Sequence, residues 1–265
     1  RLDTTVSIGA TFRMQDRDDA LVGIANGGTA RTVNEDDGNL GFKKGDVVSA
    51  VAKATHDLEL RRDNYGLFTR FSYFYDQPAA SADRREDRFD ADGLPTADRR
   101  ANNYELGRRG RDRLSHKIDL LDLFAFSRFS IADRAVAVRF GNQVVNWGES
   151  TFIGNSINSI NPIDVARIRV PGAELREALT PTPMLWTSAQ LTDALSMEAV
   201  WMTSFKRTEI DPRGSFFSTN DTLSADGDKV VVTFGRRKDD NQILTSPPDP
   251  DAMIWLPRDN DAETE

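Results

Sequence analysis

The sequence contains no cysteine, which excludes a disulfide framework, a thiol nucleophile and a Cys-ligated metal site. It has only two histidines, His56 and His116, and neither belongs to a His-Glu-x-x-His zinc motif. A Gly-x-Ser-x-Gly elbow and a phosphate-cradling glycine-rich loop with lysine are missing too. We therefore predict that the protein is not an enzyme and that it has no catalytic residue, no metal site and no cofactor.

Long hydrophobic runs are absent as well. Hydrophobic residues make up 38% of the 265 residues, charged residues 29%, and the net charge is −8. No run approaches the roughly 20 apolar residues that a membrane-spanning helix needs, so a helical membrane protein is excluded. A transmembrane β-barrel stays open, because its strands need only about 9–11 residues and carry apolar side chains at alternate positions. The length suits one large β domain or two ordinary ones.

What the sequence does have is strict alternation of apolar and polar residues. It runs through residues 6–14, 48–60, 67–75, 135–147 and 195–205, and a period of two is typical of a strand with one apolar face. We predict hairpins that turn at residues 63–66, 132–134 and 192–193, a further strand over 114–131 and a last one near 229–234. The total is about eight strands, enough for a small barrel.

Polar segments separate the predicted strands. Residues 77–113 show no sustained period and are interpreted as a long loop, and the chain from residue 236 is charged and Pro-rich. The Arg-rich stretch 108–113 has no interleaved aromatic residues in an acidic protein, so we predict no nucleic-acid binding. Asp-rich loops at 35–38, 90–93 and 226–228 lack full EF-hand spacing and are interpreted as solvated loops rather than calcium sites.

The segment from residue 141 to residue 183 is the most distinctive part of the sequence. It reads GNQVVNWGESTFIGNSINSINPIDVARIRVPGAELREALTPTP. It resembles the proteobacterial family catalogued as domain of unknown function 1302. The residues that carry the resemblance are Gly141, Gln143, Val144, Trp147, Gly148, Glu149, Ser150, Asn161, Pro162, Asp164, residues 170–175, residues 177–179, Pro181 and Met184.

The resemblance implies an antiparallel transmembrane β-barrel in the outer membrane of a Gram-negative bacterium. Family members are longer than this chain, and the C-terminal residues 261–265 lack a terminal aromatic strand, so we interpret the chain as the N-terminal part of a single barrel domain. Its start, without Met or an apolar signal region, suits a mature product after signal removal, although a fragment would begin the same way. Implied partners are membrane lipids and lipopolysaccharide, together with an envelope lipoprotein and an inner-membrane exporter of the resistance-nodulation-division type.

Charged and polar residues on the polar strand faces are the predicted lumen-facing positions. They are Arg13, Lys53, Asp57, Glu59, Arg70, Arg139, Gln143 and Glu198. If the apolar faces meet lipid, these residues line a pore or pair with one another inside it. In the alternative, a soluble β-sandwich, they would simply face water.

An inserted segment over residues 153–183 is predicted to fold into or over the lumen as a constriction. Residues 171–179 contain helix formers with Leu175 and Leu179 four apart, and Pro181 and Pro183 stop the helix. Such a short helix needs a surrounding wall, although an ordinary surface helix in a long loop would have the same pattern. The candidate constriction residues are Asn161, Asp164, Arg169, Glu174, Arg176 and Glu177.

Two functions follow from this interpretation. The favoured one is passage or export of a small or hydrophobic molecule across the outer membrane, and the alternative is a non-transporting scaffold in an envelope assembly. A third possibility, a Ser-His hydrolase built on Ser115 or Ser150 with His116, is disfavoured because neighbours on a strand point to opposite faces. His56 lies among apolar residues of its segment, which is more typical of a packed or interfacial histidine than of a ligand.

Overall fold

The computed structural model describes residues 1–84, 105–147, 160–227, 229–237 and 253–255. They form two compact units, each built from segments that are distant in sequence. The first, here the sheet unit, contains residues 1–8, 52–75 and 117–209. The second, the loop unit, contains residues 9–51, 76–116 and 210–265.

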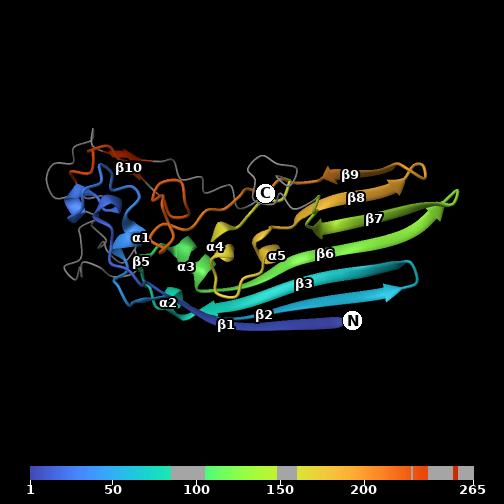
Figure 1. Cartoon of the computed structure of the whole chain (residues 1–265), viewed down its shortest axis with the longest axis horizontal. Coiled ribbons are helices and arrows are strands. Elements are labelled where there is room, and N and C mark those ends of the chain that lie inside the picture. Colours follow the sequence, from blue (N-terminus) through green and yellow to red (C-terminus); the bar gives the residue numbers. More distant parts are fainter. Residues whose placement is uncertain (85–104, 148–159, 228, 238–252, 256–265) are drawn as a thin grey trace. The chain divides into compact units, whose positions relative to one another are not determined.

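One sheet of seven strands dominates the fold (Figure 1), in the order β1-β2-β3-β6-β7-β8-β9. Its strands are β1 (Leu2–Phe12), β2 (Val47–Arg62), β3 (Tyr65–Asp76), β6 (His116–Ile131), β7 (Arg134–Gln143), β8 (Thr182–Gln190) and β9 (Ser196–Met202). Strands β6 to β9 pair antiparallel, each with the next. The predicted antiparallel β fold is therefore confirmed. In the described residues the sheet is open, with β1 and β9 at its edges, rather than closed into a barrel.

The hairpin turns lie where the sequence predicts them. Asp63, between β2 and β3, has φ 52°, and Ala132 and Asp133, between β6 and β7, have φ 49° and 62°. Two consecutive residues at positive φ suit a two-residue hairpin loop, because that backbone matches the twist of the flanking strands. Between β8 and β9 the amide of Leu191 donates to the carbonyl of Leu195. The three predicted hairpins are all present.

The two faces of the sheet differ in polarity. Large apolar side chains on one face are exposed, including Val6 (69%), Ile8 (85%), Ile118 (82%), Phe140 (64%) and Trp201 (70%). On the opposite face lie buried polar residues such as Lys53, Thr55 and Asp122. We call these the apolar face and the polar face. A water-soluble protein normally buries the apolar face of a sheet and exposes the polar face to water. This sheet has the reverse arrangement.

The inserted segment lies against the polar face. It contains two single-turn helices, α4 (Val165–Ile168) and α5 (Leu175–Ala178). The helix predicted over 171–179 is thus only one turn long, held at its start by a capping box between Glu174 and Glu177. Residues 153–159 of the predicted insertion lie outside the described residues. Among the helices of the described residues, none combines the length and the apolar character needed to cross a membrane.

A small apolar cluster lies beside the end of β7, where Asn161 of the insertion binds the backbone. Val145, Met184 and Trp186 are buried together, with Ala137 and Val200 packed against them. Asn161 bridges to the backbone of Val145, accepting from its amide at 3.1 Å and donating to its carbonyl at 2.5 Å. This pair of hydrogen bonds fixes the position at which the insertion returns to the sheet.

In the described residues, the elements that belong to the loop unit alone are short. They are η1 (Asp19–Leu21), η2 (Ile24–Asn26), α1 (Asp37–Leu40), α2 (Gln77–Ala80), β4 (Asp83–Arg84), β5 (Glu105–Leu106), α3 (Arg108–Leu114), β10 (Lys229–Val231) and β11 (Met253–Trp255). Two sequence-based expectations differ from this. The predicted loop 77–113 contains α2, α3 and a two-residue strand pair. The strand predicted near 229–234 ends at Val231 and pairs with β11 instead of extending the main sheet.

Candidate functional site: the polar face of the sheet

A buried ion pair fastens α5 to strand β2. The Nζ atom of Lys53 lies 2.5 Å from Oε2 of Glu177 and also donates to the carbonyl of Gly172 at 2.9 Å. The hydroxyl of Thr55, the next inward residue on β2, donates to Oε1 of Glu177 at 2.8 Å. Both oxygens of the carboxylate are therefore bound by strand residues, and the insertion is held by its most buried charge.

The environment of Glu177 favours its charged form. Burial by itself would raise the pKa of this carboxyl, but hydrogen bonds from Lys53, Thr55 and the amide of Glu174, with the charge of Lys53, outweigh it and lower the pKa below its ordinary value of 4.5. At neutral pH the pair is a carboxylate and an ammonium. Because the pair is buried, removing one partner would leave the other charge buried and unpaired, which costs folding free energy.

A second charged group lies beside this pair. Arg70 on β3 binds Asp57 on β2 through two nitrogens, each 2.7 Å from a carboxylate oxygen, and reaches Asp122 on β6 at 3.3 Å. Arg176 of α5 approaches the same Asp57 at 3.5 Å. Two strands and the insertion therefore meet at Asp57, and Arg70 links this group to a third strand, β6. The fork geometry of arginine suits such a shared carboxylate.

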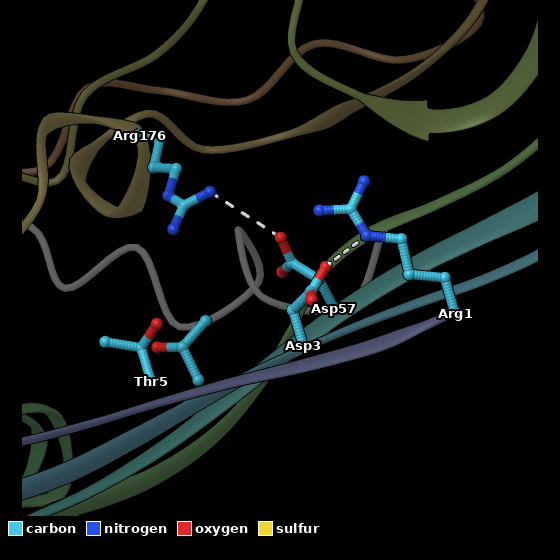
Figure 2. A pocket seen from close by; sticks show the side chains of 6 residues that line it. Arg1, Asp3, Thr5, Asp57 and Arg176 are labelled. Atoms are coloured by element: carbon cyan, nitrogen blue, oxygen red, sulfur yellow. Dashed lines mark ion pairs between the residues drawn. The ribbon is translucent and has the colours of Figure 1, made fainter.

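A cleft of about 220 Å³ opens at this point (Figure 2). Its lining residues are Arg1, Asp3, Thr5, Thr55, Asp57 and Arg176. In Figure 2 the guanidinium groups of Arg1 and Arg176 lie on either side of the carboxylate of Asp57. The lining is polar and carries both signs of charge, which suits water and small polar solutes rather than an apolar ligand.

A third ion-pair group holds α4. Arg167 forms ion pairs with Asp119 on β6 and with Asp164 at the start of α4. Lys117 also reaches Asp119, at 3.2 Å. The two short helices of the insertion are thus each tied to a different strand, α5 to β2 and α4 to β6.

The polar face changes character towards the hairpin turns that join β6 to β7 and β8 to β9. Arg139 on β7 lies over the rings of Trp186, 4.5 Å from its centroid, and Phe124, at 5.6 Å. Phe68 on β3 packs against Phe124, with ring centroids 5.3 Å apart. Glu198 on β9 accepts hydrogen bonds from the indole nitrogens of Trp147 and Trp186. This part of the face is aromatic and carries few charges.

The structure places the predicted lumen-facing residues as follows. Lys53, Asp57, Arg70, Arg139 and Glu198 lie on the polar face. Gln143 is fully buried at the end of β7 and donates to the carbonyl of Met184. Glu59 lines a smaller cleft with Arg1 and Asp3. Arg13 belongs to the loop unit instead, one residue past the end of β1, where its guanidinium donates to the carbonyls of Gln15, Asn39 and Phe42.

The predicted constriction residues fall into two groups. Asn161, Arg176 and Glu177 bind residues of the sheet unit outside the insertion, whereas Asp164 pairs with Arg167 within it. Glu174 caps α5 and pairs with Arg176, and Arg169 ends α4 with an exposed side chain.

Sequence reasoning missed several members of the site. Thr55 lies on a predicted strand and alternates with Lys53 and Asp57, so the same pattern could have identified it. Asp119 and Asp122 are three apart on β6, where Leu121 and Asp122 are both buried. The alternation therefore shifts by one residue between them, and no simple period would place both on one face.

The loop unit contains a different polar cluster. Among the described residues, Asp36, Asp37 and Asp221 form a group whose carboxylate oxygens lie within 4.8 Å of one another, a donor set that hard cations prefer. Arg213 pairs with Asp37 at 2.6 Å and offsets part of this charge. Asp36 and Asp221 are each 1% exposed. The prediction that the loop at residues 35–38 is solvated is therefore wrong for Asp36. Asp226 binds the amides of Arg109 and Gly110, and residues 90–93 lie outside the described residues.

Ser115 and His116 are close together in the loop unit. The hydroxyl of Ser115 lies 2.9 Å from Nδ1 of His116, where Ser115 is the C-cap residue after α3 and His116 begins β6. The expectation that strand neighbours point apart does not apply at this junction. Ser115 is 1% exposed, which keeps its oxygen from a substrate in this conformation. Ser150 lies outside the described residues.

These observations define a class: an antiparallel β protein whose sheet exposes its apolar face and covers its polar face with an inserted segment. The family comparison agrees with the sequence resemblance. A family model described as "Protein of unknown function (DUF1302)" matches residues 1–264. The chain belongs to this family. No curated protein and no solved structure matches it.

Proposed function

We propose that the protein is part of an outer-membrane β-barrel that passes or exports a small or hydrophobic molecule. The observation that carries this proposal is the polarity of the sheet. Apolar side chains such as Ile8, Phe140 and Trp201 are exposed on one face, while ion pairs are enclosed on the other. Lipid on the apolar face would remove that surface from water, and a lumen would accommodate the charges.

The open edges of the sheet fit the same proposal. In hydrocarbon every backbone amide needs a partner, so strands β1 and β9 would have to pair with further strands. Lipids and lipopolysaccharide would then surround the apolar face. We also propose association with an envelope lipoprotein and an inner-membrane exporter. Only the family resemblance supports these two partners.

Single-channel conductance of the full-length protein in a planar bilayer tests the proposal. We expect conductance steps whose ion selectivity shifts towards cations in Arg139→Glu, because that change reverses a charge on the polar face. Phe140→Leu, on the apolar face, is the matched control and should conduct like the wild type. A folded protein that never conducts, with or without its partners, would overturn the transport function.

One observation favours a second function, that of a scaffold with a filled interior. The insertion is held on the polar face by the buried pair of Lys53 and Glu177 and by the ion pairs of Arg167. A lumen filled in this way would not conduct. Conductance that stays absent after the insertion has been shortened, in a protein that still folds and binds lipid, would select the scaffold.

A further inference from the structure

Arg139 differs from the cations of the polar face that form ion pairs. Lys53, Arg70 and Arg167 each contact at least one carboxylate. The guanidinium of Arg139, by contrast, lies over two aromatic rings, and no hydrogen bond or ion pair joins it to any residue that the structure describes. It is half-buried all the same. Its planar set of donors is therefore available to a ligand.

The carboxylates near Arg139 are already committed. Glu198 lies on β9, two residues from Val200, which pairs with Trp186. Its carboxylate accepts hydrogen bonds from the indole nitrogens of Trp147 and Trp186. Asp122 pairs with Arg70. Each of these acids contributes a distant attraction, while none occupies the donors of Arg139. A guanidinium taken partly out of water without an acceptor is costly, and aromatic faces offset that cost only in part.

Apolar side chains, most of them aromatic, lie around Arg139 on the neighbouring strands. Register places Phe126, Arg139, Trp186 and Val200 side by side on β6, β7, β8 and β9. Phe68 on β3 and Phe124 on β6 extend this surface, with their rings in contact. Gly66 makes room for the edge of Phe126, since a Cβ atom there would lie 2.5 Å from the ring. We call these residues the aromatic–arginine surface.

We propose that the aromatic–arginine surface binds an amphipathic carboxylate, whose anionic group pairs with Arg139 and whose apolar body lies on Phe68, Phe124 and Trp186. Charge complementarity selects the occupant. A carboxylate matches the planar fork of a guanidinium with two parallel hydrogen bonds, and apolar carbon or an aromatic ring matches the flanking side chains. A neutral apolar molecule would leave the donors of Arg139 unpaired, while a small hydrophilic anion would leave the rings uncovered.

This inference rests on the proposed transport function, because it takes the bound carboxylate to be the molecule that is transported. Equilibrium binding is therefore the test, because it does not require conduction. The full-length protein in lipid nanodiscs is titrated by calorimetry with phenylbutyrate and, separately, with phenylbutanol, which differs only in replacing the carboxylate by an alcohol. We expect phenylbutyrate to bind about tenfold or more tightly than phenylbutanol, since hydrogen bonds to charged groups contribute that much.

Two substitutions locate the effect. Arg139→Gln is expected to weaken phenylbutyrate binding about tenfold and to leave phenylbutanol binding unchanged. Arg128→Gln is the matched control, because it removes the same charge from an exposed neighbour on β6 whose field reaches Arg139. It should change binding less than about twofold, as expected of a solvated surface charge. If Arg139→Gln does not fold, Arg139→Lys keeps the charge but loses the fork, and weaker phenylbutyrate binding is again expected.

Several results would overturn the proposal. They are failure of the wild type to bind phenylbutyrate, equal affinity for phenylbutyrate and phenylbutanol, and an equal loss of phenylbutyrate affinity in Arg139→Gln and Arg128→Gln. The last result would mean that positive charge in general, and not the position of Arg139, attracts the carboxylate. Binding that follows the expected pattern in a protein without conductance would support the carboxylate site and overturn transport. Conductance without phenylbutyrate binding would do the reverse.

Discussion

At the scale of single residues, the insertion depends on a charge pair that joins positions 124 residues apart. Lys53 and Glu177 are both buried, so little water can take the place of either partner. Such a pair contributes modestly compared with apolar side chains of the same volume, yet it is costly to break on one side. Its main effect is to fix where α5 lies on the sheet.

Glu177→Ala is therefore expected to destabilise the protein by about 3–5 kcal/mol, because Lys53 would remain buried without its partner. Reversible unfolding in urea, followed by tryptophan fluorescence, measures the change. The double variant Lys53→Met with Glu177→Leu should recover most of the loss, since it removes both charges and keeps apolar volume. A double variant as unstable as the single variant would contradict this explanation, because the loss would then not come from an unpaired buried lysine.

The same pair predicts a dependence on pH. The folded protein lowers the pKa of Glu177, so its contribution to stability is fully present above the ordinary value of 4.5 and is lost as the pH falls through the lower folded value. We expect the stability difference between wild type and Glu177→Gln to be constant near neutral pH and to shrink below about pH 4.5. Melting temperatures of both proteins across this range provide the check, and a difference that grows at low pH would contradict it.

At the scale of elements, hairpins account for most of the sheet, and their turns need unusual backbone. Ala132 has φ 49°, a conformation that costs an alanine about 1 kcal/mol compared with glycine or asparagine. Long strands pair around this turn from Ile131 and Arg134 onwards. The cost is tolerated because the pairing of β6 with β7 fixes the loop at two residues.

Ala132→Gly is expected to stabilise the protein by up to about 1 kcal/mol, by relieving the positive φ. The unfolding midpoint in urea measures the effect. Ala135→Gly, at an exposed strand position of β7 nearby, is the matched control and should destabilise instead, because glycine has extra freedom in the unfolded chain. A loss of stability in both variants would mean that the turn has another conformation.

The insertion is the other element with a testable role. Removal of residues 171–181 with a short Gly-Ser link takes away α5 and its contacts with Lys53, Thr55 and Asp57. If the segment restricts a lumen, conductance in a planar bilayer should rise. Lys53→Met is combined with the deletion, so that no buried ammonium is left without a partner. Unchanged permeation in a folded deletion variant would rule out a constriction.

At the scale of the whole molecule, the sheet exposes the side chains that a water-soluble fold would bury. Each exposed aromatic or branched side chain on the apolar face forgoes about 1.5–3 kcal/mol of burial. A contiguous apolar surface of this kind marks a contact with lipid or protein. The polar face, by contrast, pairs cations such as Lys53, Arg70 and Arg167 with carboxylates of the same chain.

Phe140→Lys tests what covers the apolar face. Phe140 is 64% exposed on a central strand and pairs with Ala125 and Leu185. In lipid, a lysine there should lower the stability of the protein in vesicles by about 2–4 kcal/mol. Ser188→Lys, on the polar face beside Glu198, should have little effect. Equal tolerance of both lysines would mean that water, and not lipid, covers Phe140.

The sequence by itself determined the strands of the main sheet, their turns and the family, because a period of two and turn-forming residues are local signals. Tertiary structure alone decided the rest. It paired Lys53 with Glu177, brought Asp57, Arg70 and Arg176 together, and moved Arg13 into the loop unit. It also left Arg139 between two rings. Such contacts depend on register and on where the insertion returns to the sheet, and no local pattern contains either of these.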